Sequence, residues 1–110
     1  MSEPSPHDDK IPDLEEMVAE EPEDTLARYL LATEYLKHGR PGEAAASFRA
    51  VVALDPDYSA AWGGLGGALE AAGAAEEART AWQAAASCAD RKGDHVVSRN
   101  AKAALSRLGA

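Results

Sequence analysis

Acid–base, nucleophilic or metal chemistry in this 110-residue chain would have to use three histidines, one cysteine and several adjacent acid pairs. A metal-binding helix face needs ligands three or four residues apart, and His7, His38 and His95 lie far from one another. Pairs such as Glu76–Glu77 are typical of a solvated helix face, because acid–base catalysis needs two groups with opposed pKa shifts in one pocket. We therefore expect no catalytic residue, no metal site and no enzyme.

A second candidate for chemistry is the glycine-rich segment AWGGLGGALEAAG, residues 61–73. The dinucleotide-binding pattern G-x-G-x-x-G would need glycine where Leu69 stands, and no Lys-Ser/Thr pair follows as in a phosphate-binding loop. Leu65, Ala68, Leu69 and Ala72 recur instead at helical spacing. The segment is therefore predicted to be a helix, and no nucleotide or other cofactor is expected.

Composition limits the partners and the compartment. The net charge of −8 argues against nucleic acid or an anionic membrane as the main partner. The first ten residues have neither the basic nor the apolar region of a secretory signal, and no apolar run reaches membrane length. A cytoplasmic protein is therefore expected. Cys88 is the only cysteine and is expected to be a small buried hydrophobe.

An internal repeat organises the chain. When residues 25–58 are aligned with residues 59–92, at an offset of 34, small side chains coincide with small ones and large apolar ones with large apolar ones. The coinciding pairs are Leu31 with Leu65, Ala32 with Gly66, Tyr35 with Leu69, Gly39 with Gly73, Ala44 with Ala78, and Phe48 with Trp82. Each copy has two amphipathic stretches around its central glycine, which predicts an all-α fold of two antiparallel helical hairpins.

Turn residues mark the ends of these helices. Gly39 is placed to end the first helix of the first copy in a left-handed cap, and Pro41 suits the first turn of the second helix. That second helix should stop before Pro56. Asp57 or Ser59 is expected to cap the helix that opens the second copy.

These residues resemble the tetratricopeptide repeat, whose signature is W-x2-L-G-x2-Y, then A-x3-F and a closing proline. The residues that carry the resemblance are Leu31, Ala32, Tyr35, Ala44, Phe48 and Pro56 in the first copy, and Trp62, Leu65, Gly66, Leu69, Ala78 and Trp82 in the second. Three positions depart from the signature: Arg28 replaces the tryptophan, Leu69 the tyrosine and Asp90 the second proline. The chain looks like a short bacterial protein with two full repeats over residues 25–90, and Asp90 suggests an atypical exit.

Flanking segments are expected to complete the fold, because a repeat buries its apolar side only against a neighbour. Residues 11–22 align with the second helix of a preceding, degenerate repeat, and residues 93–108 should form a C-terminal capping helix. The residues expected to face the repeats are Ile11, Leu14, Met17 and Val18 at one end, and Val97, Ala101, Leu105 and Leu108 at the other. The predicted domains are an acidic disordered tail, residues 1–10, and a helical domain, residues 11–110.

The resemblance implies a non-catalytic protein–protein interaction module, a scaffold or adaptor whose concave groove receives a peptide or helix. The implied groove positions are Leu26, Tyr29, Thr33, Leu36, Lys37, Ala60, Gly63, Gly67 and Glu70. Some members of the family grip the C-terminal carboxylates of chaperones with lysine, asparagine and arginine, and this chain has other residue types there. The residues at those five positions are Tyr29, Thr33, Gly64, Asp94 and Ser98.

The interior glycines need a reason, because each costs a helix about 0.8–1 kcal/mol relative to alanine. At Gly66 the paired helices should approach so closely that no side chain larger than a methyl fits. Gly63 and Gly67 would form a bare groove floor that lets a partner approach closely. Sequence drift, with the cost absorbed by tertiary packing, is the other explanation.

Charge asymmetry leaves two further hypotheses open. Residues 1–24 hold ten acidic side chains against Lys10, a balance of −9, whereas residues 91–110 hold five basic ones against Asp94, a balance of +4. The acidic first helix of one copy is therefore able to dock on the basic last helix of another, which would build head-to-tail homo-oligomers. Alternatively, residues 1–10 lie over the groove or the basic end of their own chain and inhibit it.

Overall fold

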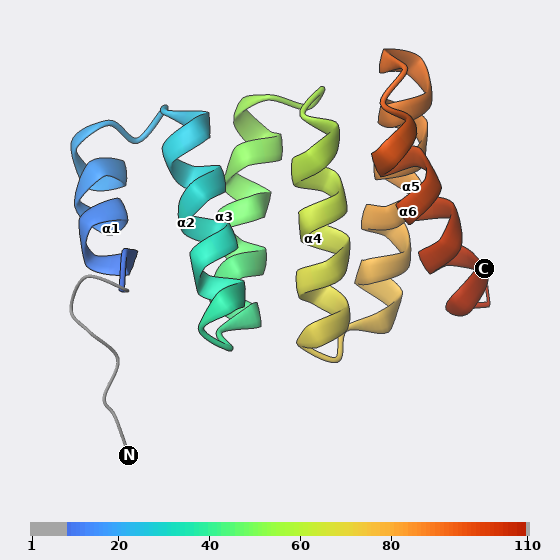
Figure 1. Ribbon diagram of the computed structural model, residues 1–110, viewed down its shortest axis with the longest axis horizontal. Coiled ribbons are helices and arrows are strands. Elements are labelled where there is room, and N and C mark those ends of the chain that lie inside the picture. The colour runs from blue at the N-terminus through green and yellow to red at the C-terminus, as the bar shows by residue number, and fades with distance from the viewer. Residues whose placement is uncertain (1–8, 110) are drawn as a thin grey trace.

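The computed structural model of the chain describes residues 9–109 (Figure 1). Within that range six helices and no strand follow one another, which confirms the all-α prediction for this part of the chain. The helices are α1 (Ile11–Glu20), α2 (Thr25–Lys37), α3 (Pro41–Leu54), α4 (Ser59–Ala71), α5 (Ala75–Lys92) and α6 (His95–Arg107). The predicted acidic tail lies outside the described residues except for residues 9 and 10.

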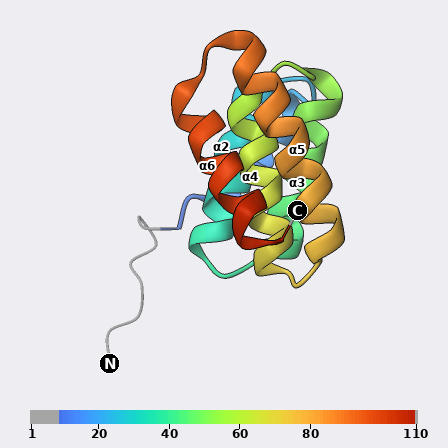
Figure 2. The ribbon, with the colours of Figure 1, turned by 90° about the vertical axis from the view of Figure 1, so that its right-hand side faces the viewer.

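The helices form two layers, as the view along the molecule shows (Figure 2). Helices α2, α4 and α6 make one layer, and α3 and α5 make the other. Each helix packs against its neighbour in the chain, and α4 also contacts α2 and α6. No helix within residues 9–109 has the length and hydropathy needed to cross a membrane.

Local sequence sets most helix boundaries as predicted. Gly39 and Gly73 follow α2 and α4 with φ of +70° and +83°, in the left-handed region that favours glycine. Pro41 is the first residue of α3. The expected cap of α4 is wrong, because Tyr58 stands at the N-cap without a side-chain bond, and the Ser59 hydroxyl donates instead to Asp94 of the next hairpin at 2.9 Å.

The core is built from the repeated positions. Leu31 and Tyr35 of α2 and the aligned Leu65 and Leu69 of α4 are all buried, and Phe48 is 2% exposed. Helix α5 buries mainly small side chains, namely Ala78, Ala81, Ala85, Cys88 and Ala89. Because these side chains are short, α5 can approach its neighbours closely, and the chain forms a core with few aromatic residues.

Two glycines of α4 make room for aromatic rings. A β-carbon at Gly66 would lie 2.6 Å from Cδ2 of Trp82, and one at Gly64 would lie 2.5 Å from Cε1 of Phe48. The expectation that a methyl group fits at Gly66 is therefore wrong. The first repeat holds Ala32 and Phe48 at the aligned positions, so the larger indole of the second repeat takes the space of the missing methyl.

The departures from the repeat signature at Arg28 and Leu69 have local explanations. The Arg28 Nε donates to the Pro22 carbonyl at 2.5 Å, and Trp62 Nε1 donates to the Pro56 carbonyl at 2.8 Å. Arg28 aligns with Trp62, and Pro22 aligns with Pro56, so the guanidinium replaces the indole as donor. Leu69 is buried like the aligned Tyr35.

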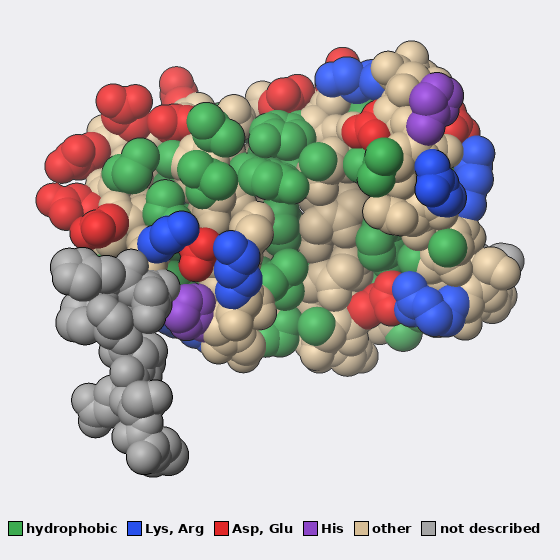
Figure 3. Space-filling model, in the orientation of Figure 1, with side chains coloured by type: hydrophobic (Ala, Val, Ile, Leu, Met, Phe, Trp, Pro, Cys, Tyr) green, Lys and Arg blue, Asp and Glu red, His purple; other side chains and the backbone are tan. Residues whose placement is uncertain are grey.

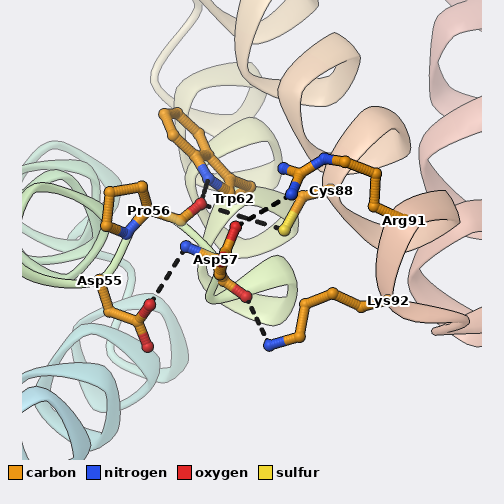
Figure 4. Close-up of polar contacts among 7 residues, drawn as sticks. All are labelled: Asp55, Pro56, Asp57, Trp62, Cys88, Arg91 and Lys92. Atoms are coloured by element: carbon orange, nitrogen blue, oxygen red, sulfur yellow. Dashed lines mark hydrogen bonds and ion pairs between the residues drawn. The ribbon is translucent and has the colours of Figure 1, made fainter.

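The exit from the second repeat, where Asp90 replaces the proline, is longer than that of the first. Helix α5 has 18 residues where α3 has 14, and it runs through Asp90 before Gly93 ends it. The additional turn brings Arg91 and Lys92 to the turn between α3 and α4, where Arg91 pairs with the Asp57 carboxylate at 3.1 Å and Lys92 donates to the Asp57 carbonyl at 2.8 Å (Figure 4). The prediction of an atypical exit at Asp90 is therefore confirmed.

The flanking helices cover the ends of the repeats unequally. Ile11 and Leu14 of α1 are buried, but Met17 is 47% exposed, contrary to the expectation that it faces the core. No helix within the described residues packs on the far side of α1. Helix α6 buries Ala101 and Ala104, and the residues it leaves half-buried are Val97, Leu105 and Leu108.

Candidate binding groove

A hollow of about 330 Å³ lies on the face formed by α2, α4 and α6. Its lining comes from all three helices and, through the gaps between them, from α3 and α5. The lining residues are Tyr29, Thr33, Leu36, Phe48, Ala60, Gly63, Gly64, Trp82, Val97 and Asn100. On this face apolar side chains gather over α2 and α3, and a tan band, which is backbone and side chains of other types, follows α4 (Figure 3). We call this hollow the groove.

Five of the nine positions implied by the resemblance line the groove. These are Tyr29, Thr33, Leu36, Ala60 and Gly63. The other four lie elsewhere. Leu26 is 59% exposed at the N-terminal end, Lys37 pairs with Glu34 at 3.2 Å, Glu70 binds Trp82 and Arg107, and Gly67 lies against the indole edge.

Side chains that the sequence placed only in the helix packing also reach the groove. Phe48 and Trp82 come from the second helix of each repeat, where the signature makes them core residues. Trp82 is half-buried and is reached from the groove where Gly63 and Gly67 of α4 carry no side chain, whereas Phe48 stays buried beneath Gly64. The four glycines of α4 are the feature of the sequence that could have predicted that a side chain from the second layer reaches the groove.

The α2 side of the groove is an aromatic wall. The Tyr29 ring stacks on that of Tyr58 with centroids 5.1 Å apart and meets the edge of Phe48 at 5.7 Å. Burial, followed by the neighbouring Tyr29 and Asp55, raises the pKa of the Tyr58 hydroxyl. Contacts of this kind are worth about 0.5–1.5 kcal/mol beyond the area they bury, and they stabilise the relative orientation of the three rings.

The floor of the groove is the indole of Trp82. A β-carbon at Gly63 would lie 3.5 Å from Cζ3 and one at Gly67 would lie 3.9 Å from Cζ2, which is ordinary contact. Trp82 Nε1 donates to Glu70 at 2.6 Å, and Arg107 of α6 donates to the same carboxylate at 2.5 Å. The hydrogen bond from Arg107, and after it the one from Trp82, lower the pKa of Glu70 against the effect of burial. The chain Arg107–Glu70–Trp82 therefore holds the indole in one orientation.

The opposite wall belongs to α6, which α4 and α5 hold in place. Asp94 accepts from the Val97 amide at 3.2 Å as N-cap and from the Ser59 hydroxyl, and these bonds lower its pKa. One turn further on, the Ser98 hydroxyl donates to Asp90 at 2.6 Å. Because α6 is fixed to both helices of the second repeat, the width of the groove is set by the folded chain.

The lining of the groove is mainly apolar and carries no charged side chain. It presents apolar and aromatic side chains, bare backbone, the hydroxyls of Tyr29 and Thr33 and the amide of Asn100. Among residues 9–109 no cluster of histidine, cysteine, aspartate or glutamate has the composition and geometry for a metal ion. Cys88 is buried, with its sulfur 4.0 Å from the Pro56 carbonyl, on the side of α5 away from this lining (Figure 4).

The fold and its repeated positions define the class of protein. The family model of the tetratricopeptide repeat matches residues 29–94, and this chain belongs to the tetratricopeptide-repeat family, whose domains mediate protein–protein interactions. A TPR repeat-containing protein of Pseudomonas aeruginosa is 36% identical over 98 residues, which are 89% of this chain and 93% of that protein.

Two solved structures of bacterial proteins have the same architecture. A solution structure of a protein from Bordetella parapertussis has a TM-score of 0.76 at 33% identity, covering 90% of this chain and 86% of that one. A tetratricopeptide-repeat domain protein from Salinibacter ruber has a TM-score of 0.72 at 28% identity, covering 79% of this chain and 98% of that one.

Proposed function

We propose that this chain is a non-catalytic adaptor whose groove binds an apolar peptide or one face of an amphipathic helix from a protein partner. The observation that carries the proposal is that Gly63 and Gly67 of α4 leave the indole of Trp82 uncovered on the side of the groove. Side-chain atoms are absent there, so a partner backbone can approach α4 as closely as small residues allow between packed helices. The aromatic wall and the α6 wall then contact the partner's side chains on either side.

The electrostatics of the groove favour an uncharged face of the partner. No lining residue carries a formal charge, and Glu70 beneath the floor is already neutralised by Arg107. A charged side chain entering the groove would lose water without finding an opposite charge, which is costly. Recognition therefore rests on shape and on apolar burial, at about 25 cal/mol per Å² of area removed from water.

A peptide selection tests this proposal. Peptides selected from a random library on the wild-type chain should bind Gly63→Leu at least tenfold more weakly, because the new side chain fills the groove. Gly42→Leu is the matched control, since a side chain there meets open space at the start of α3. In the Trp62→Phe background Trp82 is the remaining indole of the two in the chain, and its emission should shift on binding. Equal affinity for Gly63→Leu, or no peptide selected, would contradict the proposal.

A further inference from the structure

Within residues 9–109, the N-terminal end of the fold lacks one helix of the repeat pattern. Helix α1 aligns with the second helix of a hairpin, and the first helix of that hairpin is not among residues 9–109. Met17 of α1 is 47% exposed, whereas Val51, at the aligned position of α3, is 0% exposed in a helix that packs against both α2 and α4. The exposed Met17 therefore marks the place where the first helix of that hairpin would pack on α1, as α2 packs on α3.

Helix α2 extends this apolar surface. Leu30 is 42% exposed, whereas the aligned Gly64 of α4 lies against Phe48. Met17 and Leu30 line one hollow between α1 and α2, and Leu26 lies one turn before Leu30. We call Met17, Leu26 and Leu30 the N-terminal face. Three exposed large apolar side chains at one end are an interaction surface rather than scattered exposure.

Acidic side chains border the N-terminal face. Asp13 and Glu20 lie one turn on either side of Met17 on α1, and both are exposed. Residues 11–24 contain seven acidic side chains and no basic one, and these form the acidic end of the molecule (Figure 3). None of the ion pairs within residues 9–109 uses Asp13 or Glu20. Lys10 lines the same hollow, but the acidic side chains around it are more numerous, so the surface fits a basic helix that also carries apolar side chains.

Helix α6, at the opposite end of the molecule, has that character. Val96 is 63% exposed, more than any other large hydrophobic side chain in the described residues. Arg99 and Ala103 follow on the same exposed side, one and two turns later, and Lys102 lies beside them. In the repeat pattern α6 is the first helix of a hairpin, and the second helix of that hairpin is not among the described residues. A second helix of this kind is what α1 provides at the other end of the molecule.

We propose that the chain assembles head to tail, with α6 of one copy packing on the N-terminal face of the next. Val96 would contact Met17 and Leu30, and Arg99 would face Asp13 and Glu20. Together, α6 and the α1 of the next copy complete one helical hairpin between two molecules. The contact joins two different surfaces, so it propagates into open chains unless the rotation closes a ring. It leaves the groove of each copy accessible and does not depend on the function proposed for it.

Two single variants and their mixture test this assembly by sedimentation equilibrium. At low salt the average mass of the wild type should rise with concentration above the 11.5 kDa of one chain. It should fall in 1 M salt, where charges are screened within about 3 Å. Leu30→Glu and Val96→Glu should each weaken association at least tenfold. Leu54→Glu is the matched control, because Leu54 is 44% exposed on α3, a helix that contributes no residue to either proposed surface.

Mixing the two variants identifies the geometry. Leu30→Glu keeps an intact α6 and Val96→Glu keeps an intact N-terminal face, so an equimolar mixture should form a dimer of one copy of each and grow no further. A mixture that stays monomeric, or a wild type that is monomeric at every concentration, overturns the proposal. So does loss of association in Leu30→Glu alone, which would mean that two N-terminal faces pair. If the wild type is monomeric and Leu30→Glu lowers its free energy of unfolding, the N-terminal face is covered by the chain's own N-terminal segment. That result would also overturn the proposal. Gly63→Leu should associate like the wild type, which separates this result from the peptide test.

Discussion

Replacing Gly66 by alanine sets helix propensity against packing within a single residue. In an isolated helix the change gains about 1 kcal/mol. In the folded chain the new methyl carbon would lie 2.6–2.9 Å from three atoms of the Trp82 ring system, Cδ2, Cε2 and Cγ. The indole cannot turn aside freely, because its Nε1 is bonded to Glu70 at 2.6 Å. Overpacking of this kind costs about 1–3 kcal/mol, and a strained hydrogen bond to a carboxylate adds to it. We expect Gly66→Ala to lower the free energy of unfolding by about 1–2 kcal/mol.

The neighbouring Gly67 supplies the matched control. A β-carbon there would be 3.9 Å from Trp82, so Gly67→Ala keeps the gain in propensity and should stabilise the fold by up to about 1 kcal/mol. Urea unfolding followed by circular dichroism measures both variants. Because both substitutions lie in the interior of α4, the difference between them, about 2–3 kcal/mol by the same estimates, isolates the contact with the indole.

A double-mutant cycle completes this test. Gly66→Ala combined with Trp82→Phe recreates in the second repeat the alanine and phenylalanine that the first repeat holds at Ala32 and Phe48. In the Trp82→Phe background the cost of Gly66→Ala should give way to the gain in helix propensity, which is a coupling of about 2–3 kcal/mol. The reasoning would be refuted if the effects of Gly66→Ala and Trp82→Phe on the free energy of unfolding add within about 0.3 kcal/mol. It would also be refuted if Gly66→Ala and Gly67→Ala stabilise the fold equally.

Two further predictions concern the hydrogen bond between α1 and α2 and the role of α6. Tyr35 donates to Glu15 at 2.6 Å, and burial, then that bond and the charge of Glu15, raise the pKa of the Tyr35 hydroxyl to about 12. Because the pKa is raised on folding, the stabilisation is complete below the unfolded value of about 10 and is lost between about pH 10 and 12. Because the pKa values of Tyr35 and Tyr58 are both raised, phenolate absorbance should show tyrosine ionisation extending to about pH 12, and Glu15→Gln should bring the last ionisation earlier. Three tyrosines titrating together in the wild type would contradict this. Removal of residues 94–110 should cause aggregation, or lower the free energy of unfolding by at least about 3 kcal/mol, which corresponds to the burial of two large apolar side chains. Light scattering and urea unfolding measure the two effects. A monomer of unchanged stability would show that α6 is not a cap.

The sequence by itself determined the repeat and its turns. The self-alignment of the chain predicted two hairpins because each helix pairs with the next along the chain. Gly39 and Pro41 marked a helix end and a helix start because both act through their own backbone, a left-handed φ in one case and a fixed φ in the other. Such features need no knowledge of what lies across the core.

The tertiary structure decided which side chains meet across helices. Gly64 and Gly66 of α4 are explained by the rings of Phe48 in α3 and Trp82 in α5, which only the packing of those helices brings together. The family resemblance implies a groove position for Glu70, but its carboxylate accepts hydrogen bonds from Trp82 and from Arg107 of α6. Met17 has the spacing of a core residue and remains exposed because the described chain places no helix over it. Helical periodicity predicts which face of a helix is apolar, whereas burial depends on whether another helix packs on that face.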